Sequence, residues 1–145
     1  MLRPLIATVD KPDWGRLTTQ DLGGGLIETK CEGFIGKELT KQLLEQTPRV
    51  LSTGKNLCWL VDLTKMKVVE ANAQEPGREI FSMFKQAGGL AFAFVSSGDS
   101  TEAVVARTLI RAVAVVARIK VHFTHDREAA VAHLRELGQR SEPPR

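Results

Sequence analysis

The sequence lacks any apolar run of the roughly 18 residues that a transmembrane helix needs. Its first residues also lack a long apolar stretch and a small-residue cleavage site, so we expect no secretory signal. Cysteine is scarce, since Cys31 and Cys58 are too few for a disulfide framework. We therefore expect a reducing cytoplasm as the location and no stable membrane insertion.

An excess of one charge is also missing. Twenty basic side chains against 17 acidic ones give a net charge of +3 in 145 residues. This mildly basic balance is far from the concentrated patch that nucleic-acid binding usually shows, so we expect no nucleic acid partner. Hydrophobic residues make up 43% and charged residues 26%, which is the composition of a globular chain, and the length suits one domain.

The order of apolar patterns predicts an α/β fold. The early part of the chain predicts a β-hairpin around a glycine cluster, with runs at 16–20 and 26–31. An amphipathic helix follows, and strands then alternate with helices: strands near 56–63, 89–95 and 120–125, and helices near 76–86, 101–118 and 127–137. Such alternation implies a largely parallel sheet, which the hairpin makes mixed, with about five strands.

The same patterns predict where the domain lies and which strands are covered. We expect a lead-in segment at 1–15, a single domain at 16–137 and a disordered tail at 138–145. The strand near 56–63 is apolar on both alternating faces, so it should be covered by helices on both sides. The strand near 120–125 alternates between polar and apolar residues, as expected near the edge of a sheet.

No pattern in the sequence points strongly to a metal, a cofactor or a nucleophile. The three histidines, His122, His125 and His133, have no paired ligand spacing such as HExxH. Residues 96–100, together with His125 and Asp126, follow strands at the edge of the sheet where α/β proteins gather ligands. A hydrolytic site there is an alternative, but the sequence has no GxSxG elbow. We expect no metal, no cofactor and no enzymatic activity.

The helix near 101–118 is apolar over most of its circumference. Its one sizeable polar stripe consists of Arg107, Arg111 and Arg118, which we interpret as a solvated face. Such a helix is either packed deeply in the core or presents an apolar surface to a partner, and both alternatives remain open. Self-association into a homo-oligomer is open as well.

The middle of the chain carries a more specific pattern. Val61-Asp62-Leu63 is followed, after a short link, by the acidic residue Glu70 and by a helix that ends in the Lys-Gln-Ala-Gly-Gly of residues 85–89. This order resembles the STAS family, whose fold is that of the anti-sigma factor antagonist SpoIIAA, and the resemblance covers residues 16–137. It implies a SpoIIAA-like fold and a role as a bacterial regulatory protein in signalling, which acts by binding another protein such as an anti-sigma factor.

The family's regulatory motif is altered in this chain. In the family an acidic residue, two serines and a glycine begin eight residues after the aspartate of the strand. Counted from Asp62, these positions hold Glu70, Ala71, Asn72 and Ala73. Residues 65–81 contain no serine, threonine or tyrosine. The resemblance therefore implies a degenerate phosphosite at Ala71 and Asn72, where phosphate cannot add its negative charge.

The resemblance also implies a partner-binding surface. We expect Lys65, Lys67, Glu70 and Asn72 to contact the partner from an exposed loop at 65–74 and the helix start behind it. An alternative function is the carriage or sensing of a small hydrophobic ligand. SpoIIAA-like folds are similar to lipid-carrying CRAL-TRIO domains, and the apolar helix near 101–118 would then wall a pocket.

Overall fold

A computed structural model of the chain describes residues 5–11, 15–52, 58–98 and 100–140. Strands and helices alternate along most of this length. In chain order the elements are β1 (Leu5–Lys11), β2 (Gly15–Gly23), β3 (Leu26–Ile35), α1 (Lys37–Leu51), β4 (Cys58–Val69), the short 3-10 helix η1 (Ala71–Ala73), α2 (Gln74–Gln86), β5 (Ala91–Val95), α3 (Thr101–Ala117), β6 (Lys120–Thr124) and α4 (Arg127–Arg140).

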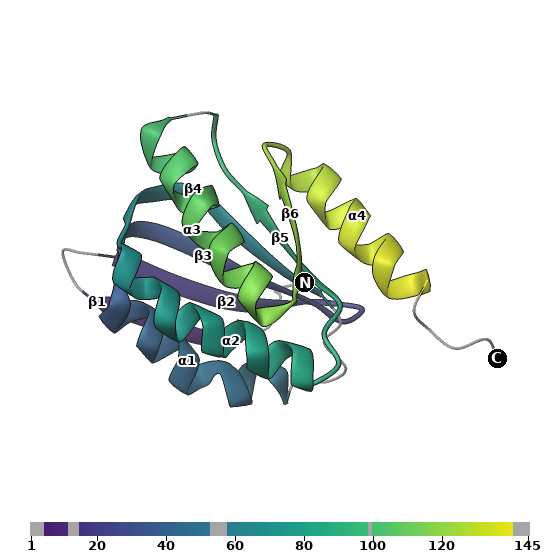
Figure 1. Cartoon of the computed structure of the whole chain (residues 1–145). Helices are drawn as coiled ribbons and strands as arrows, with labels where there is room; N and C mark the ends of the chain where they lie inside the picture. The colour runs from purple at the N-terminus through teal and green to yellow at the C-terminus, as the bar shows by residue number, and fades with distance from the viewer. Residues whose placement is uncertain (1–4, 12–14, 53–57, 99, 141–145) are drawn as a thin grey trace.

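The strands form a single mixed sheet in the order β1-β2-β3-β4-β5-β6 (Figure 1). Neighbours are antiparallel from β1 to β3 and parallel from β3 to β6. This arrangement confirms the α/β fold class with a mixed sheet. The parallel half alternates strands with helices, as the periodicity of the sequence predicts.

The sheet has one strand more than the five expected, because the lead-in contains β1. This strand pairs with β2 from Leu5 opposite Gln20 to Lys11 opposite Gly15. The segment shows no clear apolar period of its own, and the pairing that holds β1 extended is with its neighbour β2. At the other end α4 continues to Arg140, beyond the expected start of the tail at 138, while 141–145 lie outside the described residues.

The predicted hairpin is confirmed as the pair β2–β3. Gly23, Gly24 and Gly25 all have positive φ, between 67° and 83°, in the turn between the two strands. Only glycine adopts this backbone region without a steric cost, which explains the glycine cluster. The side chain of Asp21 supports the turn, since its Oδ1 accepts a hydrogen bond from the backbone N–H of Gly23 at 2.8 Å.

Helices cover both faces of the sheet. The first three helices pack on one face and α4 packs on the other (Figure 1). Along β4, Trp59 and Leu63 belong to the core under α1, α2 and α3, whereas Cys58 and Leu60 belong to the core under α4. The prediction that this strand is covered on both sides is therefore confirmed. β6 lies at an edge of the sheet, as its alternating pattern predicts.

A buried ion pair fastens α4 to the sheet. Glu28 of β3 is 1% exposed, and its carboxylate accepts two hydrogen bonds from Arg127 at the start of α4, from Nε at 2.8 Å and from Nη2 at 2.9 Å. Glu128 forms a third contact with Arg127, on the solvent side, at 3.2 Å. Hydrogen bonding to Glu28 raises the pKa of Arg127, so this guanidinium stays charged.

Replacement of Glu28 by glutamine should destabilise the fold. The variant leaves the partly buried guanidinium of Arg127 without its buried anionic partner, which costs about 3 kcal/mol in comparable pairs. Glu128→Ala removes an exposed partner of the same arginine and should change the free energy of unfolding by less than about 0.5 kcal/mol. Urea unfolding of the two variants measures both values. Similar losses in the two variants would contradict a special role for the buried pair.

Candidate functional site

The carboxyl-terminal part of β4 projects beyond its neighbour β5. Pairing with β5 runs from Cys58 to Asp62, whereas pairing with β3 continues to Val69. Within the described part of the chain, residues 63–69 therefore have a strand on one side only. The exposed loop expected at 65–74 is wrong: residues 65–69 are strand, and Gln74 already begins α2. The pairing with β3, which lies more than 30 residues away, holds these residues extended.

Two shifts of register decide which way this projecting segment of β4 (residues 63–69) faces. Lys30 pairs with Asp62 but Glu32 pairs with Lys65, and a second shift lies between Gly33 and Phe34 of β3. At each shift β4 contributes one more residue than β3, as in a β-bulge. Side chains on the inner face of the segment are therefore spaced by three, and those that line the cavity below are Leu63, Met66 and Val69. Lys65 and Lys67 are exposed.

Glu70 and Asn72 lie at the start of α1. The backbone N–H of Glu70 donates to the carbonyl oxygen of Ile35 at 2.9 Å. The carboxylate of Glu70 lies against Gly36, where an added Cβ would be 3.0 Å from Oε1. Oδ1 of Asn72 accepts the backbone N–H of Lys37 at 3.2 Å. Because Gly36 offers no side chain to cap α1, Asn72 supplies the cap from a distant segment.

The four residues expected to bind a partner therefore fall into two groups. Lys65 and Lys67 are exposed side chains on the projecting strand. Glu70 and Asn72 join the β3–α1 junction to the β4–α2 junction, and Asn72 is exposed as well. The capping role of Asn72 was missed from the sequence. The glycine before α1 was the available signal, because an α-helix that begins after glycine needs its first N–H groups satisfied from elsewhere.

The positions of the degenerate phosphosite are at the surface. Ala71 and Asn72 are exposed in η1, immediately before α2. The nearest hydroxyl before this segment is that of Thr64, which donates to Oδ1 of Asp62 at 2.6 Å. Ser82, the nearest hydroxyl after it, is half-buried within α2.

Three residues of the alternative hydrolytic site, Ser100, His125 and Asp126, make structural contacts, and Asp99 lies outside the described residues. Ser100 caps α3, since its hydroxyl accepts the backbone N–H of Ala103 at 3.2 Å. Asp126 caps α4 through the backbone N–H groups of residues 128 and 129. Nδ1 of His125 lies 3.0 Å from the backbone oxygen of Ser96. These are contacts of helix ends and turns.

The imidazoles of two histidines on consecutive elements lie together. The ring centroids of His122, on β6, and His133, on α4, are 4.6 Å apart. In the part of the chain that the structure describes, no group of three or more His, Cys, Asp and Glu side chains is placed to hold a metal ion.

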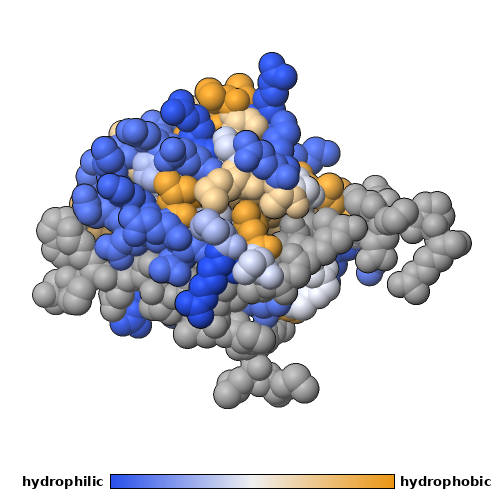
Figure 2. Space-filling view, turned by 90° about the horizontal axis from the view of Figure 1, so that it is seen from below, coloured by the Kyte–Doolittle hydropathy of each residue, from blue (hydrophilic) through white to orange (hydrophobic). Residues whose placement is uncertain are grey.

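α3 is packed on one side and exposed on the other. Its buried residues are Ala103, Ala106, Val113 and Ala114. Its exposed valines are Val104, Val105, Val115 and Val116, with relative exposures of 45%, 44%, 77% and 66%. One face of the helix is therefore packed in the core, and the other presents an apolar surface; whether a partner binds it stays a prediction. Figure 2 shows the molecule from below relative to Figure 1. Hydrophobic residues gather near the middle of this face, among mostly hydrophilic ones.

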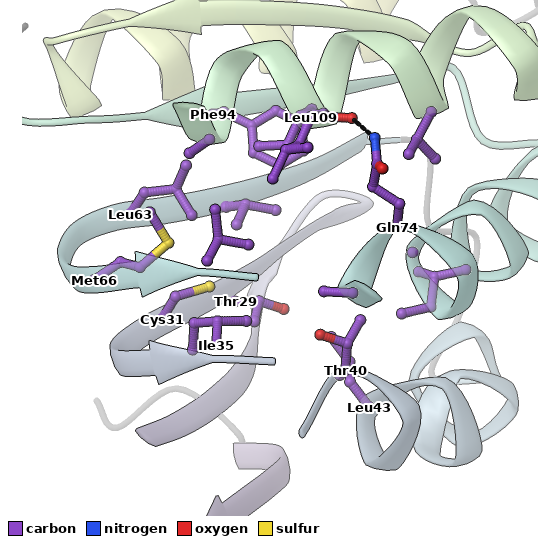
Figure 3. A pocket seen from close by; sticks show the side chains of 18 of the residues that line it. Thr29, Cys31, Ile35, Thr40, Leu43, Leu63, Met66, Gln74, Phe94 and Leu109 are labelled. Atoms are coloured by element: carbon purple, nitrogen blue, oxygen red, sulfur yellow. Dashed lines mark hydrogen bonds between the residues drawn. The ribbon is translucent and has the colours of Figure 1, made fainter. Parts of the chain in front are cut away.

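A cavity of about 140 Å³ lies between the sheet and the first three helices. Side chains from β3, β4, α1 and α3 surround it, and Gln74 of α2 stands at its border with α3 (Figure 3). Nε2 of Gln74 donates to the carbonyl oxygen of Leu109 at 3.0 Å, which joins α2 to α3. On the outer side of this bond a surface groove shares Gln74 and Val113 with the cavity wall. The predicted contribution of the helix near 101–118 to a pocket wall is thus seen in Leu109 and Val113 of α3.

Both cysteines are buried thiols. Cys31 faces the cavity, and burial, with a smaller contribution from the charge of Asp62, raises its pKa from 9.0 to about 12. Cys58 packs on the α4 side, where its Sγ donates to the carbonyl oxygen of Leu134 at 3.4 Å, and burial raises its pKa to about 11. Neither thiol is ionised near neutral pH, so both behave as small apolar groups.

The fold has counterparts among solved structures, although no protein-family model and no curated protein matches the sequence. An anti-sigma factor antagonist from Mycobacterium paratuberculosis is similar with a TM-score of 0.60 and 15% identity, over 88% of this chain and 99% of the other. An uncharacterized protein with a SpoIIAA-like fold from Shewanella loihica is similar with a TM-score of 0.53 and 14% identity, over 92% and 96%. The chain has a SpoIIAA-like fold. The resemblance noted in the sequence is confirmed at the level of the fold.

Across the described ranges, no helix combines the length and the apolar character that crossing a membrane requires.

Loss of the distant cap should weaken α1. Asn72→Ala removes the acceptor for the N–H of Lys37 and should lower the free energy of unfolding by about 1 kcal/mol. Asn72→Asp keeps the acceptor and places a negative charge at the positive end of the helix, so its stability should equal or exceed that of the wild type. Urea unfolding of both variants tests the role. An equal loss in both would show that the Oδ1 contact does not stabilise α1.

The buried Cys31 thiol should make the fold sensitive to alkali. Its pKa is about 12 in the folded chain and near 9.0 when exposed, so the stabilisation is complete below about pH 9 and is lost as the pH rises toward 12. Between pH 8 and pH 10 the wild type should lose about 1.4 kcal/mol more than Cys31→Ala. Urea unfolding at the two pH values measures this difference. Equal losses in both proteins would refute the assignment.

Proposed function

We propose that this chain is a non-enzymatic regulatory domain of the anti-sigma factor antagonist type, which acts in the cytoplasm by binding another protein. The observation that carries the proposal is the projecting segment of β4, where Lys65 and Lys67 are exposed beside the start of α2. The fold supports it, because a solved structure with the same fold is an anti-sigma factor antagonist.

The chemistry of the segment favours an acidic partner surface. Two lysines lie close together on one short strand segment, and both residues are exposed. A complementary acidic patch on the partner would speed encounter and fix the orientation of the complex. Glu70 and Asn72 would contribute mainly by holding the end of the segment against α1, as their contacts with Ile35 and Lys37 indicate.

The proposed complex is not controlled by phosphate at the matched site. Ala71 and Asn72 replace the two hydroxyl residues, and residues 65–81 offer no other acceptor. Phosphate at such a position would add one and a half to two negative charges, here beside Glu70 and Glu75. Without that switch the domain binds constitutively, or its binding is set by another part of the molecule.

Charge reversal on the projecting segment tests the proposal. Lys65→Glu combined with Lys67→Glu should reduce partner capture at least about tenfold, since two complementary charges become repulsive. The fold should be retained, because substitutions of exposed side chains usually change stability by less than about 0.5 kcal/mol. Quantitative affinity capture from lysate of the source cells, with thermal unfolding of each protein, measures both effects.

The matched control reverses an exposed lysine elsewhere. Lys41→Glu lies on α1, away from the projecting segment of β4, and should leave capture unchanged. Partner capture that survives the double reversal, or that falls equally with Lys41→Glu, would show that the proposed surface is wrong.

A further inference from the structure

The cavity under α1, α2 and α3 has the size of a small organic molecule. Its volume is about 140 Å³, close to the ~150 Å³ of an engineered apolar cavity that stays dry and binds benzene or xenon. Leu43, Leu63, Met66, Phe94 and Leu109 face it from four different elements (Figure 3). Ile80 and Phe81 of α2 also line it, so its wall is assembled only when the sheet and all three helices have packed.

The hydroxyl groups in the wall are already engaged. Oγ1 of Thr29 accepts the indole N–H of Trp59 at 2.8 Å and lies 2.8 Å from the hydroxyl of Thr19. The hydroxyl of Thr40 donates to the carbonyl oxygen of Gly36 at 2.8 Å. A buried water needs two to four polar partners, and these groups have little capacity left. The cavity therefore favours an apolar occupant over water.

Gly77 of α2 keeps part of this space open. It lines the cavity, and a Cβ added there would meet no atom within 4 Å, so no close packing demands glycine. Gly89 is a contrast, because a Cβ there would collide with the ring of Phe84. A glycine inside a helix is less stable than alanine at the same place. The missing side chain at Gly77 enlarges the cavity without any packing requirement for glycine there.

Charge limits the class of occupant. Among the residues that line the cavity, all of them in the described ranges, none is basic, and the one carboxylate is that of Glu70. An anion would therefore lose its hydration without gaining a counter-charge. We propose that the cavity binds an uncharged small molecule, aromatic or with a short alkyl chain, that has at most one hydrogen-bond donor. The lining presents almost no polar surface to the cavity, so the contacts with the occupant are mainly apolar. This proposal does not depend on the proposed protein-binding function.

The methyl group of Met66 can report ligand binding in the cavity. Met66 lines the cavity, whereas Met83, on α2, does not. In protein with isotope-labelled methionine methyl groups, added indole should shift the Met66 resonance to saturation and leave that of Met83 in place. Benzoate, which has a similar size but is an anion at about pH 8, should bind at least about tenfold more weakly than indole.

Filling the cavity should abolish this binding. Gly77→Leu places a side chain in the open space and should weaken indole binding at least about tenfold. Glu79→Leu adds the same side chain at an exposed position of the same helix and should bind indole like the wild type. Gly77→Ala adds a single methyl group, should melt no lower than the wild type, and should weaken binding about two- to threefold.

The outcomes are decisive in both directions. A Met66 resonance that does not shift with millimolar indole overturns the proposal, and so does unchanged indole affinity in both Gly77 variants. Equal affinities for indole and benzoate overturn the requirement for an uncharged ligand. Indole binding should be unaffected by charge reversal at Lys65 and Lys67. A failure of the partner-binding proposal can therefore be told apart from a failure of the ligand-binding proposal.

Discussion

The unequal lengths of β4 and β5 shape both the exposed lysine surface and the cavity. β4 has 12 residues and β5 has five, so β5 ends opposite Asp62 while β4 continues beyond it. Beyond that point β4 is held by β3 alone among the described strands. α3 follows β5 and packs across β4, and the bond from Gln74 to Leu109 joins it to α2. The exposed lysines and one wall of the cavity are therefore two faces of the same projecting segment.

The rest of the core keeps this segment in place. Trp59 stacks on Phe92 with ring centroids 5.2 Å apart, and Phe84 meets Phe92 edge-on at 4.8 Å. Trp59 and Phe92 also line the cavity, so one of its walls consists of interlocked rings that are costly to move. On the opposite face of the sheet, the pair of Glu28 and Arg127 anchors α4 separately. The cavity and this second core therefore lie on opposite faces of the sheet.

The fold was largely predictable from the sequence, and the site only in part. Long periodic segments such as α3 and strands that are apolar on both faces such as β5 carry a signal of their own, so their positions follow from the residues. The extended state of residues 65–69, the register shifts that turn Met66 inward, and the cap that Asn72 supplies all depend on segments distant in the chain. The exposure of Lys65 and Lys67 was predicted, but their place in a strand was not. Alternating lysines fit an exposed loop and a half-exposed strand equally well. For the cavity, the sequence predicted only that the helix near 101–118 could form one wall. The other walls come from elements far apart in the chain, so the cavity itself could not be predicted.

The contact between Asn72 and the first turn of α1 also bears on the order in which the molecule assembles. α1 precedes β4 in the chain, yet the atom that completes its amino terminus comes 35 residues later, after β4 has passed beside β3. The first turn of α1 is thus left to fray during synthesis until that later segment has emerged and docked. Completion of the first turn of this helix therefore requires that the parallel pair β3–β4, whose strands are more than 30 residues apart in sequence, has already formed.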